Sequence, residues 1–347
     1  MMFSYQKAMA SVDDLINQLG SFWRAKREDA VEELVEKGAE SPQDVVPALL
    51  GALGHEKDKI RENAKIAYEQ LSNRIDVIPF ILRSMGKDEA ITRSVSPASG
   101  VGGVAVGKLK GKDVIVTGSL DTNVYVMDTL GVELWKAEEP TTEIRSVAVG
   151  KLGGKDVVIG GGLNVYAWDA EGKKLWVASE PTQSVNALAI GKLGGVDVVV
   201  AGSSDTNVYV WDSFGKLLWA VKDPEDDVNG VDVGEIAGYQ VVVAASSDNR
   251  VYMWDAYGRR IWTGTEPFRK VYSVTIGKLG STKVVVAGSA EGRVYVWSQS
   301  GDILWIGKEP DSAVVGVAVG TIRKKDIVLA EAESGQVYVW DKNGNIL

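Results

Sequence analysis

The chain has 347 residues, of which 45% are hydrophobic and 24% charged, and its formal net charge at pH 7 is −9. This is the composition of a folded globular protein, and the negative charge argues against attraction of the whole protein to nucleic acid or anionic lipid. Because the chain has no cysteine and a single histidine, His55, disulfides, thiol nucleophiles, Cys-ligated metals and multi-histidine metal sites are excluded, and we expect neither enzymatic activity nor a bound cofactor or metal.

The N-terminal residues do not read as a secretory signal, because they contain no basic segment followed by an apolar segment. No apolar run in the sequence approaches the roughly 18 residues that a membrane-spanning helix needs. The sequence therefore predicts a soluble, cytoplasmic protein that does not insert into a membrane.

Residues 5 to about 88 show helical periodicity. The apolar positions of one expected helix form a single stripe: Ala30, Val31, Leu34 and Val35. Ser41 followed by Pro42 is a pattern that begins a helix, which we expect over Asp44 to Leu53. An extra helix, about Val12 to Leu19, is expected to cap this part of the chain.

This helical pattern occurs twice. Lys59–Ala64 matches Ala25–Ala30 at an offset of 34 residues, and Asp76–Leu82 matches Asp44–Leu50 at an offset of 32. Two stacked helical hairpins are a fragment of an α-solenoid. The motif I-R-x-x-A of the second copy (Ile60, Arg61 and Ala64) and its run Val77–Leu82 resemble HEAT repeats, which implies a HEAT-like domain over residues 1–89.

The rest of the chain repeats a different unit. The string V-Y-x-W-D, with small variations, occurs six times, and its tyrosines are spaced by 41, 43, 43, 43 and 43 residues: Tyr125, Tyr166, Tyr209, Tyr252, Tyr295 and Tyr338. Each unit has four short β-branched runs separated by Gly, Asn, Asp or Pro, which predicts a four-stranded antiparallel sheet. Because such a sheet has two apolar faces to bury, we expect a six-bladed β-propeller over residues 90–347.

Tryptophans recur on the third and fourth runs of these units: Trp168, Trp211, Trp254, Trp297 and Trp340 on the third, and Trp135, Trp176, Trp219, Trp262 and Trp305 on the fourth. A pattern locked to the repeat indicates packing between blades, whereas an aromatic binding platform would need exposed rings.

The sixth unit reaches Leu347 just where the others have their Leu-Trp pair. Residues 91–97 align with residues 134–140 at an offset of 43, so we expect residues 91–95 to supply the outer strand of the last blade and to close the ring, which removes an exposed edge. The alternative is that the natural chain continues past Leu347.

Three families of propeller repeat resemble this unit. Ala167–Trp176 is similar to the A-x-D-x-x-G-K-x-x-W tryptophan-docking repeat of pyrroloquinoline-quinone-type propellers, and Val147–Gly161 resembles an FG-GAP repeat. The Trp-Asp pair that ends the third run resembles WD repeats. The mixed pattern is also similar to the propellers of Bardet–Biedl-type coat subunits, a resemblance that implies a module for protein assembly.

The departures from these families matter for function. The FG-GAP calcium loop is replaced here by Lys151–Asp156, in which lysine stands in place of ligand carboxylates. The quinone-dependent dehydrogenases that share the repeat usually have eight blades and a calcium site, which six repeats do not match. The resemblance therefore implies the fold without the calcium or the quinone.

Other candidate motifs have simpler explanations. Gly102–Leu109 superficially spells a phosphate-binding loop, but Leu109 stands where Ser or Thr should bind Mg²⁺. His55 has no partner pattern around it. Adjacent acids such as Glu138–Glu139 and Asp226–Asp227 occur in turns, and adjacency alone does not make a catalytic pair.

The turns of a propeller segregate to two faces, and their charges differ. The turns after the first and third strands hold a basic set: Lys108, Lys110, Lys112, Lys151, Lys155, Lys173, Lys174, Lys192, Arg259, Arg260, Lys278, Lys283, Arg323, Lys324 and Lys325. The turns after the second and fourth strands hold an acidic set: Glu138, Glu139, Glu143, Glu180, Asp223, Glu225, Asp226, Asp227, Glu266, Glu309 and Asp311. Either solvated turns simply carry charges, or one face docks an oppositely charged partner.

Residues that break the repeat lie next to the acidic turns, and we expect a partner-binding surface there: Arg145, Asn186, Asn229, Phe268, Arg269 and Tyr272. The sequence thus predicts a non-enzymatic scaffold or adaptor that binds a protein or peptide through the propeller face and the helical repeats. The alternative is a lectin-like or small-molecule-binding propeller that uses the mouth of the channel. The oligomeric state stays open.

Overall fold

The computed structural model describes residues 10–53, 55, 57–72, 99–129, 131–322 and 325–347. The chain divides into two compact units, Met1–Ser94 and Val95–Leu347. None of the helices within the described residues is long and apolar enough to span a membrane.

The first unit contains four described helices: α1 (Val12–Gln18), α2 (Arg24–Glu40), α3 (Pro42–Leu53) and α4 (Asp58–Ser72). The expected stripe on α2 is buried, and Ile60 and Ala64 of α4 join it in one apolar core. α1 begins with a capping box in which Ser11 Oγ accepts from the backbone N–H of Asp14 and the Asp14 carboxylate accepts from that of Ser11. The expected segment 76–82 lies outside the described residues.

The second unit contains six antiparallel sheets, which we call blades 1 to 6 in chain order. Blade 1 comprises β1 (Val101–Leu109), β2 (Lys112–Ser119), β3 (Val124–Asp128) and β4 (Glu133–Ala137), and blade 2 comprises β5 (Ser146–Leu152), β6 (Lys155–Gly161), β7 (Val165–Asp169) and β8 (Lys174–Ala178). Blade 3 comprises β9 (Val185–Leu193), β10 (Val196–Ser203), β11 (Val208–Asp212) and β12 (Leu217–Val221), and blade 4 comprises β13 (Val228–Ile236), β14 (Tyr239–Ser246), β15 (Val251–Asp255) and β16 (Arg260–Gly264). Blade 5 comprises β17 (Val271–Leu279), β18 (Thr282–Ser289), β19 (Arg293–Trp297) and β20 (Ile303–Gly307), and blade 6 comprises β21 (Val314–Ile322), β22 (Lys325–Ala332) and β23 (Val337–Asp341).

Tight turns join the first two strands of each blade. In blade 2 the two turn residues, Gly153 and Gly154, have φ values of 58° and 78°. Two successive positive φ values characterise the type I′ hairpin turn, whose twist matches that of the flanking strands. Glycine adopts this conformation without steric cost, which explains the Lys/Gly turns of the repeat.

The third-strand tryptophans form the core between blades, as the sequence predicts. Trp168, Trp211, Trp254, Trp297 and Trp340 are all fully buried. Tyr209 stacks on Trp211 with ring centroids 5.5 Å apart, and both belong to a cluster shared by blades 2 and 3. The fourth-strand tryptophans also contact the next blade: the indole N–H of Trp176, for example, donates to the carbonyl oxygen of Ser213 at 3.2 Å.

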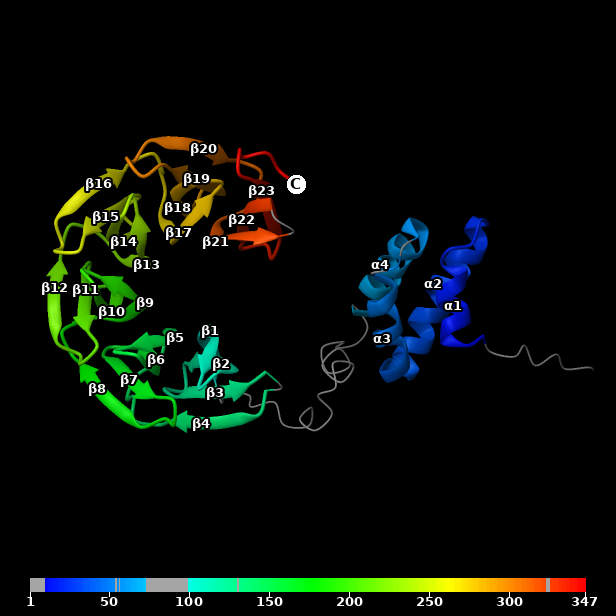
Figure 1. The fold of residues 1–347 in the computed structure, drawn as a ribbon, viewed down its shortest axis with the longest axis horizontal. Helices are drawn as coiled ribbons and strands as arrows, with labels where there is room; N and C mark the ends of the chain where they lie inside the picture. The colour runs from blue at the N-terminus through cyan, green and yellow to red at the C-terminus, as the bar shows by residue number, and fades with distance from the viewer. Residues whose placement is uncertain (1–9, 54, 56, 73–98, 130, 323–324) are drawn as a thin grey trace, which may run out of the picture. The chain divides into compact units, whose positions relative to one another are not determined.

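The six blades follow one another around an open ring, with their first strands innermost and their fourth strands outermost (Figure 1). The first strands pack in series, β1 on β5, β5 on β9, β9 on β13, β13 on β17 and β17 on β21. Within the described residues no closed ring forms, and blade 6 has three strands, with a single bridge between Trp340 and Ile346 beside β23. The expected closing strand, residues 91–95, lies outside the described part of the chain.

Candidate protein-docking face

The turns between the second and third strands, and those that join each fourth strand to the next blade, share one face of the blade unit because the strands are antiparallel. We call it the Glu-Pro face, after the Glu-Pro or Asp-Pro pair in each joining turn. It carries the expected acidic set and all six expected partner-binding residues.

One group of these acids forms bonds between blades. In each joining turn, the carboxylate before the proline accepts a hydrogen bond from the indole N–H of the buried tryptophan in the next blade. The pairs and distances are Glu139 with Trp168 (3.3 Å), Glu180 with Trp211 (3.1 Å), Asp223 with Trp254 (2.7 Å), Glu266 with Trp297 (3.0 Å) and Glu309 with Trp340 (2.9 Å). Burial opposes ionisation of Glu309, but hydrogen bonds from Trp340 and from the backbone outweigh it and hold the pKa of Glu309 below its ordinary value.

The sequence contains a signal for this pairing that our sequence analysis missed. The acid precedes its tryptophan by 31 residues in four of the five pairs. At the same spacing, blade 1 has Met127 in place of tryptophan and Ser96 in place of the acid. Because the methionine side chain has no N–H group, it needs no carboxylate acceptor. The absence of the acid at position 96 is therefore consistent with the absence of the tryptophan at position 127.

A second group of acids holds the turns between the second and third strands. The Asp205 carboxylate accepts from the Tyr209 hydroxyl at 2.8 Å and from the backbone N–H of Thr182 at 2.7 Å, across the joining turn. Burial favours the neutral acid, but these hydrogen bonds prevail and lower the pKa of Asp205. In blade 4, burial and the neighbouring Asp248 carboxylate raise the pKa of Tyr252 to about 12, against the opposing effect of Arg250.

We expect Asp205→Asn to destabilise the protein by about 1.5–3 kcal/mol at pH 7, because a buried, charge-assisted hydrogen-bond set is lost. The folded-state pKa of Asp205 is depressed, so its contribution is present above the ordinary value of 3.8 and disappears as the pH falls through the folded pKa. Chemical denaturation of both proteins from pH 7 to pH 3 measures this. A difference between the two proteins that stays constant down to pH 3 would contradict the assignment.

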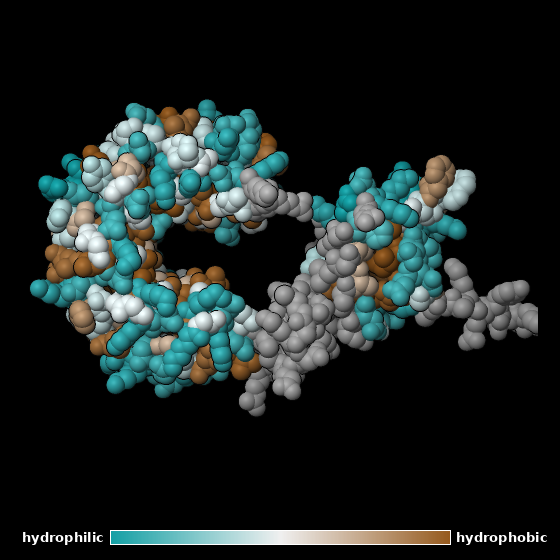
Figure 2. All heavy atoms as spheres, in the orientation of Figure 1, coloured by the Kyte–Doolittle hydropathy of each residue, from teal (hydrophilic) through white to brown (hydrophobic). Residues whose placement is uncertain are grey.

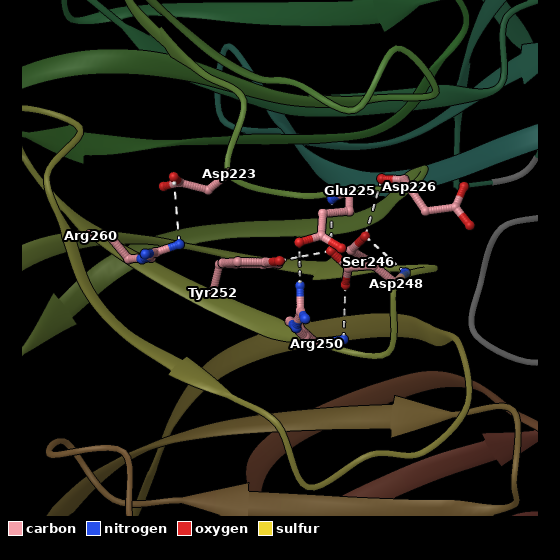
Figure 3. Close-up of polar contacts among 8 residues, drawn as sticks. All are labelled: Asp223, Glu225, Asp226, Ser246, Asp248, Arg250, Tyr252 and Arg260. Atoms are coloured by element: carbon pink, nitrogen blue, oxygen red, sulfur yellow. Dashed lines mark hydrogen bonds and ion pairs between the residues drawn. The ribbon is translucent and has the colours of Figure 1, made fainter.

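The most acidic joining turn lies between blades 3 and 4, and most of its acids have partners (Figure 3). Glu225 pairs with Arg250 at 3.0 Å, and Asp223 lies 3.5 Å from Arg260. The Asp248 carboxylate accepts from the backbone N–H of Glu225 at 2.8 Å. Asp226 is exposed on this turn, and its carboxylate accepts from the backbone N–H of Asp227 at 2.8 Å. Part of the acidic charge on this face is therefore engaged in ion pairs and hydrogen bonds that hold the turns.

Two of the expected partner-binding residues also connect blades. The Asn186 amide donates to Ser204 Oγ at 2.9 Å and to the carbonyl oxygen of Val228, in the next blade, at 3.2 Å. Asn229 repeats both bonds one blade later, to Ser247 and Val271, each at 2.9 Å. Both side chains are half-buried, and their amide donors are engaged in tying neighbouring first strands together.

Arg145 lies in a depression of about 420 Å³ at blades 1 to 3, where it pairs with Glu143 at 2.9 Å. The depression coincides with the one unit spaced by 41 residues, because the blade 2 turn reads Gly161-Gly162-Leu163-Asn164 and lacks the acid that blades 1, 3, 4 and 5 have in this turn. In its place, the Leu163 backbone N–H donates to Thr142 Oγ1 at 3.1 Å. The short spacing was the sequence signal for Thr142 and Leu163, which we had not singled out.

Phe268 and Arg269 lie together in a second depression, of about 370 Å³, at blades 5 and 6. Phe268 is 57% exposed, and the Arg293 guanidinium lies 5.0 Å from the centre of its ring, within the range of a cation–π interaction. The remaining lining residues are Ala290, Glu291, Pro310, Asp311, Ser312 and Ala313. Tyr272 is half-buried on β17 and does not line this depression. The structure thus brings together Phe268 and Arg269, which lie apart from Arg145.

On the opposite face, aspartates accompany the expected basic residues. Lys151 pairs with Asp156 at 2.6 Å in the β5–β6 hairpin, and Lys192 pairs with Asp197 at 2.9 Å in the β9–β10 hairpin. Lys151 and the backbone N–H of Lys110 in the preceding blade lower the pKa of Asp156. Much of the basic charge predicted for this face is therefore neutralised locally. Within the described ranges, no group of three His, Asp or Glu side chains could hold a metal ion.

The helical unit has its own exposed groove, of about 580 Å³, between α2 and α4. Val31 and Ile66 contribute apolar surface to it, and Arg24, Arg27, Glu28 and Glu32 contribute charges of both signs. Before α2, the exposed rings of Phe22 and Trp23 meet edge to face, with centroids 5.7 Å apart.

Comparison of the chain with protein-family models gives no match. Comparison with curated proteins also gives none.

Proposed function

We propose that this chain is a non-enzymatic scaffold that binds a protein or peptide partner on the Glu-Pro face, at the depression lined by Phe268 and Arg269. The single observation that carries the proposal is Phe268. In the other joining turns the residue after the proline is Thr141, Thr182, Glu225 or Asp311, so the packing of the repeat does not require an aromatic ring there.

The surroundings of Phe268 suit a binding hot spot. Its ring is exposed yet held in place by Arg293, and Arg269 stands beside it. Aromatic and arginine side chains dominate the binding energy of protein interfaces when they lie together in a pre-formed pocket. The exposed pair Phe22 and Trp23 offers a second contact surface on the helical unit.

The proposal rests on two finer features of the fold. The helical unit is HEAT-like, which is supported by the single apolar core that the stripe on α2 forms with residues of α3 and α4. The sheets are blades of a β-propeller, which is supported by the identical junctions between successive blades. For the lectin-like alternative, the polar residues expected at the channel mouth include Asn186 and Asn229, whose amide groups are engaged in bonds between blades.

We expect the double variant Phe268→Ala/Arg269→Glu to recover at least about tenfold less partner than the unmodified protein in quantitative affinity purification from the native host. The reason is that removal of a hot-spot residue costs more than about 1.4 kcal/mol of binding free energy. The matched control is Phe214→Ala, since Phe214 is an even more exposed phenylalanine on the opposite face, in the β11–β12 turn. Partners that survive the double variant but are lost with the control would overturn the proposal.

A further inference from the structure

Each junction between blades contains the same contact at its inner edge. A glycine of one first strand faces a β-branched aliphatic residue of the next first strand: Gly107 faces Val149, Gly150 faces Ile190, Gly191 faces Val233, Gly234 faces Ile276 and Gly277 faces Val319. A Cβ atom added to any of these glycines would lie within 3.3 Å of that residue. The first strands are therefore about as close as their backbones allow.

The two ends of the array each hold half of such a contact. Within the described part of the chain, the sixth glycine of the series, Gly320 on β21, has nothing within 4 Å of an added Cβ atom. The residue that should face it by the same rule is Val106 on β1, which is 75% exposed, and Val104 beside it is 61% exposed. Among the described residues, blade 6 thus offers an empty site for an aliphatic side chain, and blade 1 offers an unburied aliphatic side chain.

The described blades do not bring these two faces together. β21 packs on β17, and β1 packs on β5, at the two ends of the open ring (Figure 1). In the space-filling view the arms that end in blade 1 and blade 6 are separate (Figure 2). Because these five inner contacts are already tight, closer approach of the first strands at these junctions would force side chains into the facing backbones.

The chemistry of blade 1 indicates what kind of neighbour it takes. Met127 replaces the tryptophan that would bind the acid of a preceding Glu-Pro turn. Gly131, with a φ of 77°, occupies the turn position at which Gly172, Gly215 and their equivalents contact the fourth-strand tryptophan of the preceding blade. Blade 1 therefore retains the turn glycine that would contact a neighbouring blade's tryptophan. It lacks the indole N–H that would donate a hydrogen bond to the acid of a preceding Glu-Pro turn.

We propose that the free faces of blades 1 and 6 bind one further four-stranded β-blade, supplied by a separate polypeptide, which completes the ring. The donor presents a Val or Ile to Gly320, a glycine to Val106 and a fourth-strand aromatic ring to Gly131. These requirements are taken from the five observed junctions, with which the two faces are continuous. The proposal is independent of the Glu-Pro face, so either can fail without the other.

Cysteine labelling tests this directly, because the chain has no cysteine of its own. The variants Val106→Cys and Gly320→Cys place single thiols on the two faces, and Phe214→Cys places one elsewhere as the control. The probe is a synthetic polypeptide with the sequence of residues 271–312, a blade that contains Ile276, Gly277 and Trp305. We expect this probe to slow maleimide labelling at positions 106 and 320 at least tenfold and to leave position 214 unchanged.

A probe with Ile276→Asp is expected to give no protection, because it would place a carboxylate against Gly320. Two results would overturn the proposal. One is unchanged labelling of both faces at saturating concentrations of the unmodified probe. The other is a spontaneous intramolecular disulfide in the free Val106→Cys/Gly320→Cys protein, which would show that the ring closes on its own six blades.

Discussion

Replacing Trp211 with alanine is expected to lower the free energy of unfolding by about 3–5 kcal/mol, the loss typical of a fully buried aromatic residue. Trp211 is completely buried and belongs to an apolar cluster, shared by blades 2 and 3, that also contains Ile159 and Ala167. Its removal leaves a cavity and also leaves the Glu180 carboxylate without its indole donor. The shift of the thermal or urea midpoint of the blade unit measures the effect.

Two further variants separate these contributions. Glu180→Gln keeps an acceptor oxygen for the indole N–H and should cost no more than about 1 kcal/mol. Trp211→Met introduces the residue that blade 1 has at this position and should cost less than alanine, because methionine fills irregular space. If the Trp211→Ala protein were as stable as the Trp211→Met protein, the Trp211 indole would not be the core element that we describe.

Gly277→Ala is expected to destabilise the protein by about 1–3 kcal/mol, as overpacking of a filled core does. The added methyl group would lie 2.5 Å from Val319 Cγ1, and this β-branched neighbour has little rotamer freedom to move away. Gly320→Ala is the matched control, because the same methyl group at the equivalent position of blade 6 meets no described residue within 4 Å. It should be neutral, or stabilising by up to about 1 kcal/mol through the unfolded chain.

The comparison of these two glycines uses thermal unfolding at identical protein concentration. Equal losses for both variants would mean that blade 6 has a packed neighbour at Gly320 in the free protein. Such a result would also contradict the free face on which a donor blade is proposed to dock. The two glycine variants therefore test the packing of the blades, and the cysteine variants test its consequence.

The Glu-Pro face illustrates how little a charge pattern alone says about binding. Its most regular carboxylates accept from buried indoles or from tyrosine hydroxyls, and their spacing follows the repeat because the bonds do. The residues that depart from the repeat behave differently. Phe268 and Arg269 line a depression and are exposed, which is why the proposed docking site is placed on them.

The sequence alone determined the local architecture of this protein. The spacing of Tyr166, Tyr209 and their equivalents predicted each four-stranded sheet, and the 3.6-residue stripe on α2 predicted its buried face, because both follow from periodicity along one short segment. Tertiary structure alone decided which polar groups are free and whether the blades meet. Asn229 is engaged because its acceptor belongs to the next blade. The spacing of the inner strands likewise depends on contacts such as Gly277 with Val319, which no single repeat contains.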